Sequence, residues 1–122
     1  MPNHKPQPSK TLAKLDDKAL QHVADYFKLL SEPTRLKILN ILRDGECNVG
    51  ELCGLIGGSQ ANISKHLAQL AQAGLVERTT RGTAAYYVIA DPSIYTLCDL
   101  VCGQVASRLE KQAALRVLFQ GS

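Results

Sequence analysis

Polar side chains cluster in one stretch of this 122-residue chain, SQANISKHLAQLAQAG at 59 to 74. Amide side chains can pair bidentately with adenine in a major groove, and lysine can reach guanine or phosphate. Those available for such contacts are Gln60, Asn62, Ser64, Lys65 and Gln69. The stretch therefore predicts either a helix that reads DNA or a solvated helix face of similar composition.

The same stretch also has the apolar spacing and the end signals of a helix. Its apolar residues recur every three or four positions and form one stripe, which can pack on a core; they are Ile63, Leu67, Leu70 and Ala71. Ser59 is a good N-cap, because its hydroxyl can accept an unpaired backbone N–H. Gly74 stands where a left-handed residue would end the helix.

Four cysteines offer a second kind of chemistry: Cys47, Cys53, Cys98 and Cys102. Cys98 and Cys102 are four residues apart, so on a helix they share one face. Two thiolates at this spacing can bind a soft ion such as As(III), Cd(II), Pb(II) or Cu(I). Cys47 or Cys53 would supply a third sulfur if the helices approach. The alternatives are redox sensing by thiol oxidation and simple packing of buried cysteines.

Helical spacing continues upstream of the polar stretch. Residues 12 to 30 predict a first helix, with a break near Asp16–Asp17. A second helix follows, with Ser31 as N-cap and Pro33 in the first turn, where proline's missing N–H is tolerated. Its expected core face is Leu36, Leu39, Ile41 and Leu42.

A short third helix is expected from about Val49 to Ile56, capped by Asn48, with Leu52, Leu55 and Ile56 facing inward. Gly57-Gly58 then turns the chain into the polar helix. A short helix, a glycine-containing turn and a longer helix form the helix-turn-helix pattern.

The hydrophobic period changes after Gly74. Residues 75–79 and 85–89 are rich in β-branched and aromatic residues, and Arg81-Gly82 marks a tight turn between them, so they predict a β-hairpin. Its tip, residues 79–83, is polar and basic and is suited to lie along a phosphate backbone as a wing, or is an ordinary solvated hairpin. Asp91-Pro92 then begins a long apolar helix, about 92 to 116. This helix and the first helix are the expected dimer interface.

Composition agrees with a small intracellular protein. The length indicates one domain, and the net charge of +3, from 14 Lys and Arg against 11 Asp and Glu, is mildly basic. We expect a disordered arm at 1–10, no secretory signal and no membrane span, and hence a cytoplasmic location with reduced thiols. Cys-x-x-Cys, HExxH, GxSxG and P-loop spacings are absent, so we do not expect an enzyme.

The whole pattern resembles the ArsR/SmtB family of winged helix-turn-helix repressors. The resemblance is carried by LLSEPTRLKILNIL at 29–42, GECNVGELCGLIGGSQANISKHLAQLAQAGLV at 45–76, TRGTAAYYVI at 80–89 and DPSIYTLCDLVC at 91–102. It implies a mainly α fold with a β-hairpin wing and a homodimer on a palindromic double-stranded DNA operator, released by a metal, metalloid or thiol-reactive signal. It places Gln60, Ala61, Ser64 and Lys65 at the bases, and Lys65, Arg78 and Arg81 at phosphates. His66 either bonds a backbone or phosphate, or packs between helices.

The cysteines depart from the best-known sensor sites of that family. Of its Cys-x-Cys-x-x-Cys cluster on the third helix only Cys53 remains, with Cys47 displaced by one residue. Of its zinc site on the last helix only Asp91 matches, because Ser93, Gln104 and Ser107 replace the other ligands. Cys98 and Cys102 are therefore the expected sensing residues.

We thus expect a wing-bearing DNA-binding repressor at 11–116, controlled by a thiol-directed signal. The alternatives are the same repressor without an inducer site, and a winged-helix module that binds protein in place of DNA. The closing residues, 117–122, belong to LRVLFQGS, which resembles the cleavage site of a viral 3C-type protease; they are either a cloning remnant or a native tail.

Overall fold

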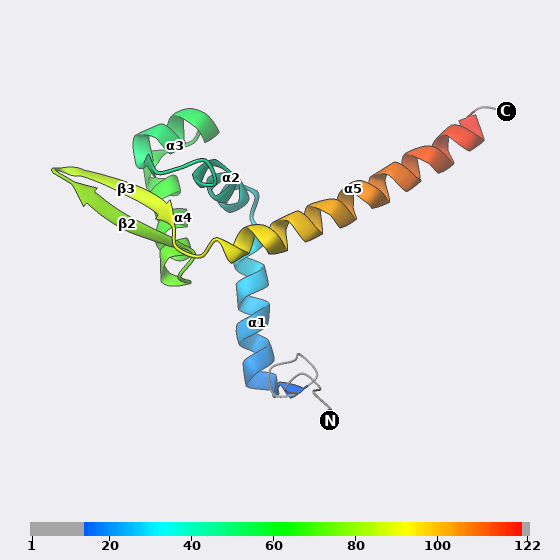
Figure 1. The fold of residues 1–122 in the computed structure, drawn as a ribbon, viewed down its shortest axis with the longest axis horizontal. Coiled ribbons are helices and arrows are strands. Elements are labelled where there is room, and N and C mark those ends of the chain that lie inside the picture. The colour runs from blue at the N-terminus through cyan, green and yellow to red at the C-terminus, as the bar shows by residue number, and fades with distance from the viewer. Residues whose placement is uncertain (1–13, 121–122) are drawn as a thin grey trace, which may run out of the picture. The chain divides into compact units, whose positions relative to one another are not determined.

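The computed structural model describes residues 14–120, and the chain divides after Ile89 into two compact units. The first contains α1 (Asp17–Leu30), α2 (Pro33–Leu42), β1 (Cys47–Asn48), α3 (Val49–Ile56), α4 (Gln60–Gln72), β2 (Val76–Arg81) and β3 (Ala84–Ile89). The second contains α5 (Ser93–Gln120). The expected mainly α fold with a β-hairpin is confirmed (Figure 1). The predicted domain at 11–116 spans both units, and the predicted arm at 1–10 lies outside the described residues.

The boundary between the first two helices lies one residue later than predicted, because the N-cap of α2 is Glu32 and not Ser31. Asp16 caps α1 by accepting the backbone N–H of Ala19 at 2.8 Å, so the suspected break is the start of the helix. Ser31 is not the N-cap of α2: it ends α1, and its hydroxyl donates to the carbonyl of Lys28 at 2.7 Å. The N-cap is Glu32, whose carboxylate accepts the backbone N–H of Thr34 at 2.9 Å.

The buried face of α2 is also shifted from the predicted one. Ile38, Leu39 and Leu42 are buried, whereas Leu36 is 41% exposed. At 3.6 residues per turn, two positions are about 200° apart, so Leu36 and Ile38 lie on opposite sides of the helix. The inward placement of Leu55 on α3 is wrong too, because its side chain is 67% exposed.

The helix α4 begins and ends where its sequence signals predict. The hydroxyl of Ser59 accepts the backbone N–H of Asn62 at 3.1 Å. Gly74 adopts φ +81°, which disfavours a side chain, and the N–H of Leu75 donates to the carbonyl of Leu70 at 3.0 Å. This is the Schellman ending, which satisfies a carbonyl left unpaired by the last turn.

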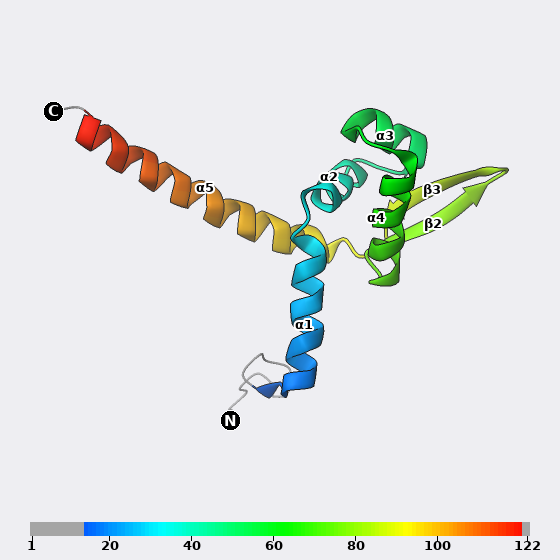
Figure 2. The same ribbon diagram turned by 180° about the vertical axis from the view of Figure 1, so that it is seen from behind.

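The hairpin belongs to a three-stranded antiparallel sheet of order β1-β3-β2. The two-residue strand β1 was not predicted, because two residues carry no periodic signal. Arg81 pairs with Ala84 as the last residue of β2, so the turn is Gly82-Thr83 and not Arg81-Gly82. Gly82 has φ +61°, the conformation that two-residue hairpin turns require. Seen from both sides, the hairpin extends away from the helices of its unit (Figures 1 and 2).

The second unit consists mainly of the helix α5, which runs on to Gln120 and so includes most of the tail that we set apart at 117–122. Asp91 precedes it and accepts both the backbone N–H of Ser93, at 3.1 Å, and its hydroxyl, at 2.6 Å. The Ser93 hydroxyl holds the pKa of Asp91 below its ordinary value. Within residues 14–120, no helix is both long and apolar enough to cross a bilayer.

The N-terminus of α3 is fixed by a reciprocal cap, which gives a first prediction. Asn48 accepts the backbone N–H of Glu51 at 2.7 Å, and the Glu51 carboxylate accepts the backbone N–H of Asn48 at 2.9 Å. Asn48→Ala should cost about 0.5–2 kcal/mol of unfolding free energy, measured by thermal unfolding followed by circular dichroism. Asn40→Ala, at an exposed position inside α2, is the matched control. Equal melting temperatures for the two variants would contradict the cap.

Candidate DNA-binding interface

The helix α4 presents two opposite faces. Ile63, Leu67 and Leu70 are fully buried and join the core of the first unit. The predicted contact residues at its N-terminal half are exposed: Gln60, Ala61, Asn62, Ser64 and Lys65. An apolar stripe thus fixes the helix, while amide, hydroxyl and ammonium groups face solvent over its first two turns. Ser59 is exposed as well, although its hydroxyl is engaged as the cap.

The helix α4 packs against both α2 and α3, and its C-terminal end leads directly into β2. The buried side chains that join these elements are Ile38, Leu39, Leu42, Leu52, Ile63, Leu67, Leu70, Leu75 and Val76. The polar face of α4 is therefore carried by a packed core and not by a mobile loop. Such rigid support is what precise recognition of a groove requires.

Both predicted basic residues of the hairpin lie on β2 and are exposed. Arg81 has partners of its own: its Nη2 donates to the Glu46 carboxylate at 2.5 Å, and its guanidinium lies over the Tyr86 ring, 5.1 Å from the ring centre. Its side chain nevertheless remains 64% exposed. Arg81 is thus held at the hairpin with solvent access, and Glu46 competes with any phosphate for it.

His66 lies apart from the exposed polar face. Its side chain is only 12% exposed. Its Nδ1 accepts from Nε of Arg35 at 3.1 Å, and its Nε2 lies 3.2 Å from the shielded Oε2 of Glu32. The N–H of Thr34 holds the pKa of Glu32 below its ordinary value, so this partner is an anion at neutral pH. The geometry therefore favours the packing role for His66 over a phosphate contact.

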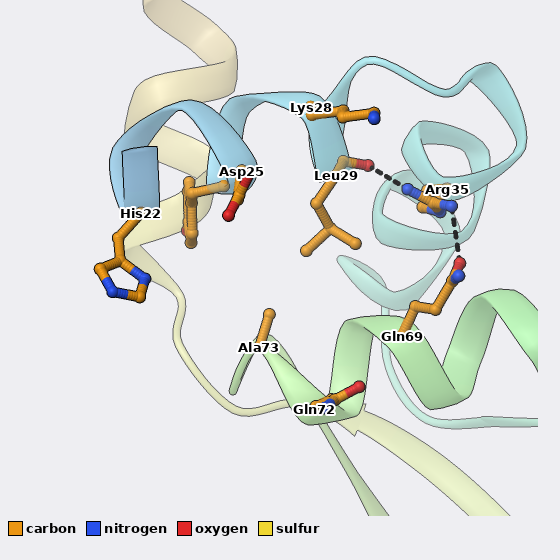
Figure 3. Close-up of a pocket in the computed structure, with 9 residues that line it drawn as sticks. His22, Asp25, Lys28, Leu29, Arg35, Gln69, Gln72 and Ala73 are labelled. Atoms are coloured by element: carbon orange, nitrogen blue, oxygen red, sulfur yellow. Dashed lines mark hydrogen bonds between the residues drawn. The ribbon is translucent and has the colours of Figure 1, made fainter. Parts of the chain in front are cut away.

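Arg35 is the residue that sequence reasoning missed. Besides His66, its guanidinium donates to the Leu29 carbonyl at the end of α1, at 3.1 Å, and to the Gln69 side-chain oxygen on α4, at 2.6 Å (Figure 3). Gln69 is thereby half-buried in an internal contact and does not share the exposed face. The available signal was an arginine in the first turn of an amphipathic helix, two residues after its N1 proline, which is weak without the fold.

An open hollow of about 650 Å³ lies beside this arginine, between α1, α2 and the C-terminal part of α4 (Figure 3). Its lining includes Asp25 and Leu29 from α1 and Gln72 and Ala73 from the end of α4. Arg35 links the two helices across this hollow.

The four cysteines lie among the described residues, and none is joined in a disulfide. Cys98 is half-buried and Cys102 exposed, and both lie on α5, one turn apart. Cys47 is in β1 and Cys53 in α3, both half-buried. Burial raises the pKa of the Cys47 thiol, and the carboxylates of Glu51 and Glu46 raise it further. The Cys47 thiol is therefore protonated at neutral pH and less nucleophilic than a thiolate.

Residues 14–120 contain no group of three or more His, Cys, Asp and Glu side chains arranged to hold a metal ion. Cys98 and Cys102 by themselves provide two soft ligands.

A short helix, a glycine turn and a polar-faced second helix on a common core, followed by a basic hairpin, define a winged helix-turn-helix DNA-binding protein. The comparisons agree. The family model described as "Bacterial regulatory protein, arsR family" matches residues 32–78. The HTH-type transcriptional regulator Rv0081 of Mycobacterium tuberculosis is 34% identical over 93 residues, which are 75% of this chain and 82% of that protein. Its crystal structure covers 80% of this chain and 99% of its own, with 31% identity and a TM-score of 0.75.

Two further relatives add information. The homodimeric winged helix-turn-helix domain of Mb0332 from Mycobacterium bovis, solved by NMR, is 34% identical, covers 83% of this chain and 95% of its own, and gives a TM-score of 0.69. The cadmium resistance regulatory protein CadC of Listeria innocua is 32% identical over 98 residues, 80% of this chain and 82% of that protein. This chain belongs to the arsR family of bacterial regulatory proteins. It is a DNA-binding transcriptional regulator and not an enzyme.

Proposed function

We propose that this protein is a homodimeric repressor that binds a palindromic operator through α4 and the β2–β3 wing. The observation that supports this most is the exposed polar face of Gln60, Asn62, Ser64 and Lys65, carried on a fully buried stripe. In a dimer, two such helices would enter successive major grooves about 34 Å apart. Arg78 and Arg81 would contact phosphates on the flanking backbone.

Dimerisation is supported by apolar side chains that a single chain leaves exposed. On α5 these are Leu100, Val101, Val105 and Leu109, each more than half exposed. The helix α1 buries none of its own side chains, and its Phe27 is 53% exposed. A second copy of the chain is the proposed cover for both helices, as the homodimeric relative from M. bovis suggests.

The test of this function is a gel-shift titration on the DNA upstream of the protein's own gene, at low and at physiological salt. We expect a dimer–duplex complex that survives competition by unrelated duplex. A protein that stays monomeric and shows no preference for that DNA would favour the alternative of a protein-binding winged-helix module.

We further propose that the signal that releases the operator acts on Cys98 and Cys102. The pair combines an exposed thiol with a half-buried one on the same helical face. It is open to a soft ion such as As(III), Cd(II), Pb(II) or Cu(I), or to an oxidant or reactive sulfur. The cadmium named for the Listeria relative is consistent with the first class. Binding or reaction of the signal at the thiols must be coupled to DNA binding by a free energy of about 1–3 kcal/mol.

A second prediction follows for the thiols. The double variant Cys98→Ser, Cys102→Ser should still bind the operator in gel shifts. It should no longer be released from DNA by the reagent that releases the wild type, whether As(III), Cd(II), sulfide or peroxide. Cys47→Ser is the matched control and should respond like the wild type, because its raised pKa keeps that thiol protonated. Release of the double variant from DNA by the same reagent would contradict the assignment. If no reagent released the wild type, a repressor without an inducer site would be favoured.

A third prediction concerns the ion pair at the wing. Glu46→Gln should tighten operator binding by up to about fivefold, because exposed ion pairs contribute about 0.2–1 kcal/mol and Arg81 would no longer have to leave a carboxylate. Glu77→Gln, on the exposed face of β2, makes the same charge change away from Arg81 and serves as the control. Fluorescence anisotropy on labelled operator measures both. Equal gains in the two variants would show a net-charge effect and not release of Arg81.

A further inference from the structure

We infer that Arg35 is a positioning residue that transmits the placement of α1 to the recognition helix α4, and so sets the spacing of the two recognition helices in the dimer. This inference rests on the proposed function, because it assumes that α1 is part of the dimer interface. It assigns a regulatory contact to a residue that lies outside the DNA-reading face.

The guanidinium joins elements that are distant in sequence. It donates to the carbonyl of Leu29, six positions earlier, and to Gln69 and His66, 34 and 31 positions later. The Leu29 carbonyl is among the last four of α1, which have no partner within the helix. A cation is also favoured at that end by the helix dipole. Arg35 therefore donates to a carbonyl that has no partner within α1, and the same guanidinium group also binds two side chains of α4.

The helix α1 packs against α2 and is at most half-buried along its length. No side chain of α1 is fully buried, and an open hollow of about 650 Å³ lies between α1 and the end of α4 (Figure 3). A shift of α1 at its C-terminal end would move the Leu29 carbonyl, and Arg35 would carry that movement to Gln69 and His66. Glu32 completes the arrangement, because its carboxylate caps α2 and faces the other side of the His66 ring.

Lysine can replace this arginine only in part. The fixed fork of the guanidinium serves three acceptors on two helices at once, whereas the three donors of an ammonium group all sit on one nitrogen atom. Arg35 is half-buried, and three of its nitrogen atoms donate within the protein. It should therefore influence DNA binding without neutralising a phosphate.

The test compares Arg35→Met and Arg35→Lys with Lys37→Met, which removes the same charge from an exposed position on α2. Anisotropy titrations use the operator and a version with one base pair inserted between its half-sites, over a range of salt. We expect Arg35→Met to weaken operator binding about two- to thirtyfold, to keep the wild-type salt slope, and to lose part of the preference for the native spacing. Arg35→Lys should be intermediate.

A second readout needs no DNA. Hydrogen exchange of the amides at 27–30 should be faster in Arg35→Met than in Lys37→Met, because the end of α1 loses its anchor. If Arg35→Met does not fold, Gln69→Leu removes one of the two α4 acceptors of Arg35 and should give a weaker form of the same spacing phenotype. Wild-type exchange and spacing preference in a folded Arg35→Met would overturn the inference, as would a salt slope reduced by about one, which marks a phosphate contact. Failure of the wild type to bind any operator would instead defeat the proposed function, while the exchange experiment still decides the link itself.

Discussion

Leu67→Ala is expected to lower the unfolding free energy by about 2–5 kcal/mol, the range for removing a large aliphatic side chain from a packed core. Leu67 is fully buried on the inner face of α4, where α2 and α3 pack against that helix. The loss combines the transfer of its methyl groups to water with the cavity that they leave. Urea unfolding followed by circular dichroism, at one fixed protein concentration, measures it.

Leu55→Ala provides the matched control, because it makes the same chemical change on the neighbouring helix α3 at a side chain that is 67% exposed. Its cost should stay within about 0.5 kcal/mol, as for most surface substitutions. A comparable loss of stability at both positions would contradict the placement of α4 on the core. It would also remove the reason for assigning the opposite face of α4 to DNA.

Gln60→Ala combined with Lys65→Ala should remove most of the sequence-specific affinity. A good bidentate base contact is worth about 1–3 kcal/mol of discrimination, so loss of the amide alone should weaken operator binding about five- to 150-fold. Loss of Lys65 should in addition reduce the salt slope by about one if its ammonium contacts a phosphate. Both side chains are exposed on the first two turns of α4 and leave the buried stripe untouched.

The control for this pair is Gln72→Ala, an exposed amide in the last turn of the same helix that lines the hollow. Fluorescence anisotropy on operator and on unrelated duplex separates specific from non-specific binding. We expect the double variant to bind both duplexes with nearly the same weak affinity, and Gln72→Ala to behave as wild type. Operator preference that survives in the double variant would mean that other residues read the sequence.

The elements with long periodic patterns and clear end signals could be predicted from the sequence. The bounds of α3 agree with the prediction, as do the caps Asn48, Ser59 and Gly74, because caps depend on local geometry that a few residues encode. The corner at Ser31 could not be placed, because serine and glutamate compete as caps and only the tertiary position of α2 decides between them.

The site shows the same limit. Exposed residues of α4 could be assigned from one helical face, but the partners of His66 and Arg35 come from segments about 30 positions apart. Local periodicity cannot indicate contacts between residues so far apart in the sequence. The contact between Arg81 and Glu46 was hidden for the same reason, since it depends on β1, a strand too short to be recognised.

The central claim is that α4 enters the major groove in two places on one operator. Dimethyl sulfate footprinting tests it directly, because the reagent methylates guanine N7, an atom that only the major groove exposes. The account predicts two protected guanine clusters centred about 10 base pairs apart, both lost with Gln60→Ala and Lys65→Ala. Tight binding with every guanine N7 still reactive would contradict it.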